Sequence, residues 1–310
     1  MNSRDSTPID LTIAAVERDT GIGKDTLRVW ERRYGFPVPH RDAHGERNYP
    51  MVQVEKLRVI KRLMDQGHRP GRIVAQPLEA LQHLSRGEAT LRAPQTLPQD
   101  HAEKHLAIYL TLLQNQDEEG LRTQLLTTLS HEGLQKFVAL WVAPLIVMVG
   151  EAWARGDLAV HQEHLFTECV SRILRQAIAA VPRGAKGTKP TVLLTTFPQE
   201  AHGLGLLMVE SVLTLQGCRC VSLGTQTPVR DIAQAAMAHR VDVVGLSFSV
   251  NMNANQIVDG LTELKLLLPK HMQVWAGGQA PVLRRRPIDA VRVLQDLSAI
   301  DAAVQAWGQG

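Results

Sequence analysis

The apolar and polar positions along the chain fall into successive patterns that differ in period. Residues 11–65 form short segments with apolar side chains at helical spacing, separated by glycine turns. From residue 101 to 181 the helical spacing is nearly continuous, which predicts helices near 101–115, 118–131, 134–155 and 160–180. After residue 190, β-branched apolar runs alternate with helical segments, a pattern typical of a doubly wound parallel sheet.

These patterns predict a multidomain chain with domains at 1–86, 101–181 and 191–310, joined by polar, proline- and glycine-containing linkers at 87–100 and 182–190. The helices of the central domain are expected to form a four-helix bundle, with a kink at Pro144. The last domain is expected to be a Rossmann-like α/β fold, with strands at 192–196, 218–223, 241–247 and 274–276 and helices at 206–215, 229–239, 255–267 and 288–303.

The first domain has the features of a DNA-binding module. A short helix at 11–19 precedes a glycine turn and a second helix at 24–34, on which Leu27 and Trp30 lie on one side and basic residues on another. Such a helix suits the major groove of DNA. The segment 41–49 predicts a two-stranded wing that brings arginines to the DNA backbone, and a further helix follows at 52–65.

Charge and cysteine content agree with this interpretation. The net charge is +3, and residues 1–86 carry 15 Lys and Arg against 11 Asp and Glu, so the basic excess lies at one end. Three cysteines are too few for a disulfide framework, and the sequence has no run of eighteen apolar residues and no hydrophobic signal core. We therefore expect a cytoplasmic protein without a membrane partner.

The order of motifs in the first domain resembles the MerR winged helix-turn-helix. Tyr34-Gly35 follows two arginines, Gly45-Glu46-Arg47 and Tyr49 lie in the wing, and the next helix has a Val-x-x-Leu-x-x-Ile pattern. The resemblance covers about residues 9–75 and implies dimers on pseudo-palindromic double-stranded DNA. It places the DNA contacts at Lys24, Thr26, Arg28, Arg32, Arg33, Tyr34, Arg41 and Arg47. Because no cysteine precedes Cys169, cysteine-based metal sensing is not expected.

The strand-to-helix segment 191–205 carries the candidate cofactor chemistry. A histidine, His202, follows Glu200 by two residues and precedes Gly205 by three, directly after a buried parallel strand. Ligands bind beyond the carboxyl ends of such strands. An imidazole there can ligate a metal while the carboxylate accepts a hydrogen bond from the other ring nitrogen, and Gly205 would let a bulky ligand approach the backbone.

This segment resembles the Asp-x-His-x-x-Gly loop of cobalamin-binding domains, with Glu200 in place of Asp. In that family the histidine is the lower cobalt ligand, and small residues at later strand ends leave space for the nucleotide tail of the cofactor. The resemblance therefore assigns cobalt ligation to His202 and tail contacts to Ser247, Ser249, Gly277 and Gly278. Ser249 stands where the family usually has Leu.

A second motif lies in the bundle, where nine residues separate Trp153 from the pair Glu163-His164. This spacing is similar to that of the light-sensing cobalamin regulators of the CarH/LitR type. The resemblance implies that Trp153 packs over the 5′-deoxyadenosyl group of adenosylcobalamin and that Glu163 and His164 help to hold it. Those relatives have a histidine directly after the Trp that binds cobalt once the upper ligand has left, whereas this chain has Ala154.

The sequence as a whole predicts a transcriptional regulator rather than an enzyme: an adenosylcobalamin-dependent light sensor that binds DNA in the dark as a dimer or tetramer, represses transcription and is released by light. One alternative is a MerR-type regulator whose cobalamin-like domain binds no cofactor, or a different tetrapyrrole, and serves assembly. A corrinoid methyl-carrying enzyme would need a catalytic partner domain, for which no residues remain.

Overall fold

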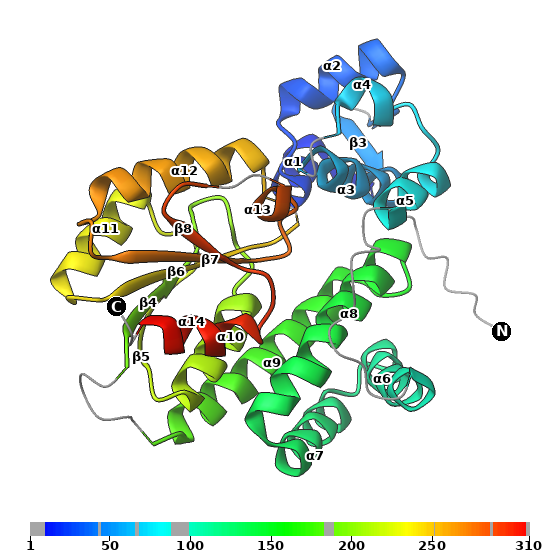
Figure 1. The fold of residues 1–310 in the computed structure, drawn as a ribbon. Helices are drawn as coiled ribbons and strands as arrows, with labels where there is room; N and C mark the ends of the chain where they lie inside the picture. The colour runs from blue at the N-terminus through cyan, green and yellow to red at the C-terminus, as the bar shows by residue number, and fades with distance from the viewer. Residues whose placement is uncertain are drawn as a thin grey trace. The chain divides into compact units, whose positions relative to one another are not determined.

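The computed structural model describes residues 10–42, 45–65, 68–87, 99–182, 189–250, 252–285 and 288–307. The chain folds as two compact units, Met1–Leu91 and Arg92–Gly310, and each is described by itself (Figure 1). Most of both predicted linkers, and residues 43 and 44 in the wing, lie outside the described residues.

The first unit is a helical domain with a small antiparallel sheet of order β1-β3-β2. Its core is built from apolar side chains of the helices around the buried Tyr49, and Leu27 and Trp30 belong to this core as the helical spacing predicted. In chain order the elements are β1 (Asp10–Thr12), α1 (Ile13–Thr20), α2 (Lys24–Tyr34), β2 (His40–Arg41), β3 (Arg47–Pro50), α3 (Met51–Asp65), α4 (Pro70–Ile73) and α5 (Leu78–Gly87).

The start of the first helix differs from the prediction. Leu11 and Thr12 were expected to belong to the first helix but lie in β1, where Leu11 pairs with Tyr49 of β3. Thr12 then caps α1, because its Oγ1 accepts a hydrogen bond from Ala15 N over 3.3 Å. The predicted two-stranded wing thus gains a third strand, which ties the first helix to the wing.

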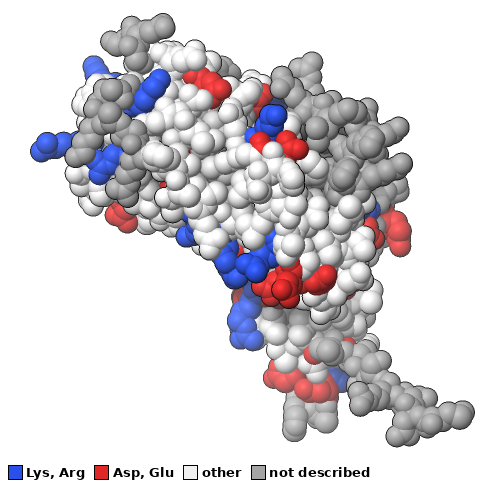
Figure 2. Space-filling model, turned by 90° about the horizontal axis from the view of Figure 1, so that it is seen from below, with Lys and Arg blue, Asp and Glu red and all other residues white. Residues whose placement is uncertain are grey.

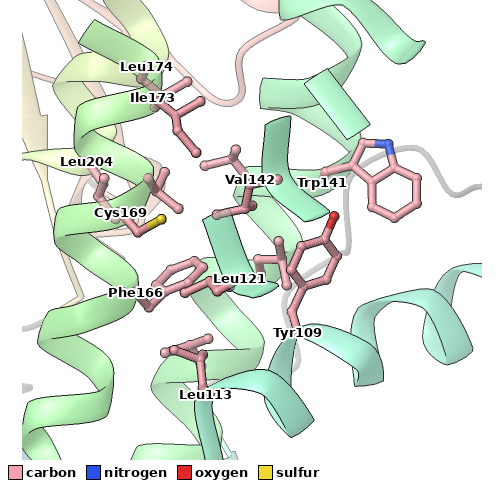
Figure 3. Packing of buried hydrophobic residues seen from close by; sticks show 14 of the residues in the cluster. Tyr109, Leu113, Leu121, Trp141, Val142, Phe166, Cys169, Ile173, Leu174 and Leu204 are labelled. Carbon is pink, nitrogen blue, oxygen red and sulfur yellow. The ribbon is translucent and has the colours of Figure 1, made fainter. Parts of the chain in front are cut away.

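The second unit begins with the predicted bundle. The elements are α6 (Gln99–Gln114), α7 (Glu118–Lys136), the π-helical segment η1 (Phe137–Val142), α8 (Ala143–Arg155) and α9 (Val160–Ala180). Figure 3 shows Tyr109, Leu121 and Phe166 in the bundle core, with Trp141 at its edge. Leu204 from the α/β domain belongs to the same core.

The third predicted helix of the bundle, 134–155, is divided. The wide turns of η1 precede α8, and Pro144 lies in the first turn of α8. Val142 has a right-handed helical backbone, with φ −64° and ψ −46°, so α8 continues η1 directly. Gly133, with φ 74°, interrupts the helical backbone one turn before η1. By length and composition the run Glu118–Trp153 passes as a membrane span, a property that it shares with core helices of bundles, and its buried side chains pack in the bundle core.

The rest of the second unit is a five-stranded parallel sheet of order β5-β4-β6-β7-β8, which confirms the predicted fold class. Helices α11 and α12 cover one face, and α10 and α14 cover the other (Figure 1). The bounds are β4 (Thr191–Thr195), α10 (Leu204–Leu215), β5 (Arg219–Gly224), α11 (Val229–Ala238), β6 (Val243–Phe248), α12 (Ala254–Leu267), β7 (Gln273–Gly278), α13 (Val282–Arg285), β8 (Val291–Leu294) and α14 (Ala299–Trp307).

The helix predicted at 288–303 is wrong in its first half. Residues 291–294 form the edge strand β8, paired with β7, and the helix α14 starts only at Ala299. Asp296 marks the change, because its Oδ1 accepts hydrogen bonds from Ser298 N over 2.9 Å and Ala299 N over 3.1 Å. Such an acceptor satisfies the first amides of a helix and stops it from extending backwards.

The strand order creates a switch point between β4 and β6. The chain leaves β4 for β5 on one side and returns to β6 on the other, so the loops after β4 and β6 diverge at the carboxyl edge. The bundle packs against α10, the helix that follows the loop after β4. Helix α9 lies on α10, and Leu204 and Leu207 of α10 belong to the bundle core.

Candidate functional site

The centre of the candidate site is the carboxylate of Glu200, which lies at the switch point and is 1% exposed. Its Oε1 accepts hydrogen bonds from Nδ1 of His202 over 2.5 Å and from His202 N over 3.0 Å. Its Oε2 accepts from Ser249 N, after β6, over 2.7 Å. One buried carboxylate therefore joins the loops after β4 and β6 and fixes the orientation of the His202 ring.

The electrostatics of Glu200 favour its ionised form. Burial acts to raise its pKa, but the hydrogen bonds from His202 and from the amide and hydroxyl of Ser249 outweigh burial, and the pKa lies below its ordinary value. An ionised Glu200 accepting at Nδ1 selects the tautomer with the proton on Nδ1 and the lone pair on Nε2. The His202 side chain is 61% exposed, so a ligand can approach its ring.

Ser249, which stands where the family usually has Leu, has a partner within the chain. The sequence comparison treated this residue as a mismatch with a possible cofactor contact. In the structure its amide and hydroxyl both serve the Glu200 carboxylate. The residue type is therefore explained by the buried charge, and any contact of Ser249 with a cofactor stays a prediction.

The close packing of neighbouring atoms accounts for the glycines of the site. A Cβ on Gly205 would lie 2.5 Å from Oγ of Ser247, so a side chain at residue 205 would require that hydroxyl to move. Gly278 has φ 108°, and a Cβ there would collide with the carbonyl of Phe248. A Cβ on Gly277 would meet the Leu294 carbonyl at 3.3 Å. These contacts pack the sheet and neither assign nor exclude a ligand.

The bundle motif lies where α8 turns into α9. Trp153 is half-buried in the last turn of α8 and packs against the bundle core, and Gly156, with φ 82°, ends that helix. Glu163 lies in the first turn of α9, and its Oε1 accepts a hydrogen bond from Oγ1 of Thr167 over 2.8 Å. Nε2 of His164 lies 3.7 Å from Glu163 Oε2, and the His164 side chain is 68% exposed. The turn brings the three residues to one end of the bundle, as predicted.

Sequence reasoning missed Gln162, which holds this turn in place. Its buried Nε2 donates to the carbonyls of Leu113, over 2.9 Å, and Gln114, over 3.3 Å, at the end of α6. Its Oε1 accepts from Ala159 N over 2.7 Å. The glutamine therefore fastens the start of α9 to α6, and only its place at the third helical position offered a signal in the sequence.

The basic face of the first unit is built from α2 and the wing. Thr26, Arg28, Arg32 and Arg33 are exposed on α2, Arg41 is exposed on β2, and Lys24 and Tyr34 are half-buried. Arg28 Nη1 donates to Asp25 over 2.9 Å, Lys24 Nζ lies 3.5 Å from Glu17, Arg41 donates to the Gly45 carbonyl over 3.0 Å, and the Arg33 guanidinium lies 5.4 Å from the Tyr34 ring centroid.

Arg47 differs from these residues because it joins the wing to the helix. Its Nε donates to Glu31 Oε2 over 2.8 Å, and a hollow between α2 and the wing is lined by Asp25, Arg28, Val29, Glu31, Arg32 and Arg47. Figure 2 shows acidic and basic side chains in small groups on the face that it presents. The α2–wing surface thus carries the side chains suited to phosphates and base edges.

The donor set at His202 suits a particular kind of metal centre. Among the described residues, no group of three or more His, Cys, Asp and Glu side chains could hold a metal ion. A single oriented imidazole cannot chelate a bare ion, but it could supply one ligand to a metal that a macrocycle already holds. The residues therefore fit a corrin-bound cobalt better than a free cation.

Comparisons with known proteins agree with both halves of this description. A MerR HTH family regulatory protein model matches residues 11–75, and two models of a B12 binding domain match residues 107–178 and 190–309. The chain is 34% identical over 263 residues to the HTH-type transcriptional repressor CarH of Myxococcus xanthus, covering 84% of this chain and 86% of that protein.

Two further likenesses are weaker. The HTH-type transcriptional repressor CarA of Myxococcus xanthus is 29% identical over 239 residues, covering 77% of this chain and 76% of CarA. Among solved structures, the monomethylamine corrinoid protein of Methanosarcina barkeri superposes with a TM-score of 0.53, covering 66% of this chain and 99% of that one. At 15% identity the last match shows a shared fold alone.

Proposed function

This chain belongs to the MerR-type transcriptional regulators that carry cobalamin-binding domains, and from that premise we propose that it senses light through adenosylcobalamin and represses transcription in the dark. The family is one of regulators and not of enzymes. The observation that carries the proposal is the buried Glu200, which holds the tautomer and orientation of the exposed His202 ring at the switch point of the sheet.

The residues of both domains have complementary tasks in this proposal. When bound, adenosylcobalamin supplies a cobalt–carbon bond that light breaks. His202 holds the lower side of the cofactor through Nε2, and Glu200 keeps the proton on Nδ1. Trp153 offers an aromatic face for adenine, and Glu163 and His164 offer polar groups near it. Gly205, Ser247, Ser249, Gly277 and Gly278 are the proposed lining for the nucleotide tail.

One pair of helices connects the lower and upper groups. Helix α10 begins at Leu204, two residues after His202, and packs on α9, whose first turn carries Glu163. Loss of contacts at Glu163 would therefore change the packing of α9 on α10, the helix that begins next to His202. We propose that this shifts the population between a dark homo-oligomer that binds its operator and a lit form that releases it.

The experiment is a comparison of spectra and DNA binding in darkness and in green light. Protein loaded with adenosylcobalamin in the dark should bind duplexes selected from a random-sequence pool, and illumination should change the visible spectrum and weaken binding. His202→Ala should lose the spectrum of imidazole-ligated cobalamin. A protein that takes up no cobalamin would overturn the proposal and favour the assembly-only alternative.

A further inference from the structure

The turn between β5 and α11, residues 225–227, contacts the His202 loop at several points. Thr227 N donates to the carbonyl of Thr196 over 3.0 Å, at the end of β4. Nε2 of Gln226 donates to the carbonyl of Pro198 over 3.0 Å, in the middle of the loop. Thr225 Cγ2 lies 3.3 Å from the place that a Cβ on Gly203 would take, at the far end. The three consecutive residues therefore bracket the loop from Thr196 to Gly203.

Gln226 itself has an unusual backbone. Its φ is 61°, in the left-handed region that favours glycine or asparagine, so the conformation is held by its surroundings. In that conformation Gln226 N donates to Thr196 Oγ1 over 2.8 Å. The Thr196 hydroxyl in turn donates to the carbonyl of Glu200 over 2.6 Å. A continuous path of hydrogen bonds thus leads from the backbone of Gln226 to the residue that orients His202.

We propose that Gln226 is a positioning residue for the cobalt-ligating imidazole. The side chain fixes the loop at Pro198 and the strained backbone fixes it at Thr196, so Glu200 and His202 stay in place when a ligand pulls on Nε2. This inference rests on the proposed ligation by His202. Partners beyond the ligand shell typically change metal affinity 10- to 100-fold, and the lower part of that range is expected for one exposed amide.

Two variants remove the hydrogen bond of the side chain to Pro198, one with a residue that tolerates the left-handed backbone and one without. Gln226→Met keeps the length of the side chain and removes its N–H donor. Gln226→Asn tolerates the left-handed backbone but is one methylene too short to reach the Pro198 carbonyl. Gln234→Ala, which alters an exposed glutamine on α11, is the matched control. All three proteins should keep the thermal unfolding midpoint of the wild type within a few degrees.

The readouts are the spectrum of bound cobalamin, its dissociation rate, and amide hydrogen exchange in the protein without cofactor. Both Gln226 variants should lose part of the imidazole-ligated spectrum, release cobalamin about 10-fold faster, and exchange the His202 and Ser249 amides faster, while Gln234→Ala behaves as wild type. Unchanged ligation and exchange in both Gln226 variants would overturn the inference.

The spectrum of His202→Ala distinguishes the inference from the proposed function. If His202→Ala leaves the cobalamin spectrum unchanged, His202 is not the cobalt ligand. Gln226 then positions no cobalt ligand, even if residues 225–227 slow amide exchange in the loop. If His202→Ala changes the spectrum and the Gln226 variants do not, ligation stands and the positioning role is wrong.

Discussion

Arg47 of the wing and Glu31 of α2 form an ion pair with 2.8 Å between Nε and Oε2. The hydrogen bond to Glu31 raises the pKa of Arg47, and the two side chains are 25% and 30% exposed. This contact explains why an acidic residue lies on a face otherwise suited to DNA. Glu31 sets the position of the wing relative to α2, and Arg47 keeps further N–H groups for a phosphate.

The first prediction separates these two roles. Arg47→Ala should weaken DNA binding. It should also reduce the slope of the logarithm of the binding constant against the logarithm of the salt concentration by about 1, the value of one phosphate contact. Glu31→Gln should weaken binding less and leave the salt dependence unchanged, because half-exposed ion pairs contribute only ~0.2–1 kcal/mol. Gel-shift titrations of a selected duplex at several salt concentrations give both values.

Two further variants complete this series. Arg28→Ala or Arg32→Ala should cost about 1–3 kcal/mol if the residue reads a base edge. Arg230→Ala, an exposed arginine on α11, is the control and should bind as the wild type does. An Arg47→Ala protein with the salt dependence of the wild type would show that the wing arginine contacts no phosphate.

Much of the architecture follows from local pattern, and the family and regulator class predicted from the resemblance of the motifs are confirmed. The spacing of Leu27 and Trp30 predicts α2, and the β-branched run before Glu200 predicts β4. Leu11 and Arg292 were assigned to helices because a three- or four-residue strand shows too few periods to be separated from a helix. Both strands are defined by their partners, β3 and β7.

Only those parts of the candidate site that are close together in the sequence could be predicted from it. Glu200 and His202 are two residues apart, and their contact follows from the loop between β4 and α10. Gln226 reaches the same loop only because β5 lies beside β4, and Gln162 reaches α6 only because the bundle folds back on itself. Contacts of this kind depend on tertiary packing, which no local pattern of the sequence contains.

The second prediction concerns the pH dependence of stability. Because the folded protein lowers the pKa of Glu200, its ionised form stabilises the fold above the unfolded-state pKa of ~4.3, and this contribution is lost as the pH falls through the lower, folded-state pKa. Glu200→Gln should therefore reduce the dependence of the thermal midpoint on pH in this acidic window. Parallel curves for wild type and Glu200→Gln would contradict the assigned pKa direction.

The third prediction tests Gln162. Gln162→Ala leaves Ala159 N and two carbonyls at the end of α6 without this partner. A buried polar group that loses its hydrogen bond lowers the free energy of unfolding by about 1–3 kcal/mol. The thermal midpoint should fall, and the preference for adenosylcobalamin over other cobalamins should weaken because the turn carrying Glu163 is released. Gln135→Ala, at an exposed position of α7, should change neither quantity. A destabilised variant with full adenosyl preference would limit Gln162 to a structural role.

The fourth prediction uses Ala154, at the position where the CarH/LitR-type motif described in the sequence analysis would have a second cobalt-binding histidine. Without that histidine, the lit protein should lose cobalamin on dialysis more readily than the dark protein. Ala154→His should improve retention after illumination and leave retention in the dark unchanged. Equal retention of cofactor by the lit wild type and the lit variant would show that another group already serves as the upper ligand.

The last prediction joins cofactor and assembly through Trp153. Truncation of a fully buried Trp to Ala costs ~3–5 kcal/mol, and Trp153 is only half-buried, so Trp153→Ala should still fold. It should bind cobalamin through His202 but lose most of its preference for the adenosyl form. If contacts above the cofactor stabilise the dark oligomer, the variant should also assemble and bind DNA poorly in the dark, and light should change little.

The control for this prediction is Trp141, a second bundle tryptophan, which lies in η1 and is 9% exposed. Trp141→Ala should lower the thermal midpoint at least as much as Trp153→Ala, because it removes more buried surface, yet it should keep the adenosyl preference and the response to light. Size-exclusion chromatography of the three proteins, dark and lit, makes the comparison. If Trp153→Ala still assembles in the dark and dissociates in light, Trp153 does not couple the cofactor to assembly, because the contact it provides would then be dispensable for both states.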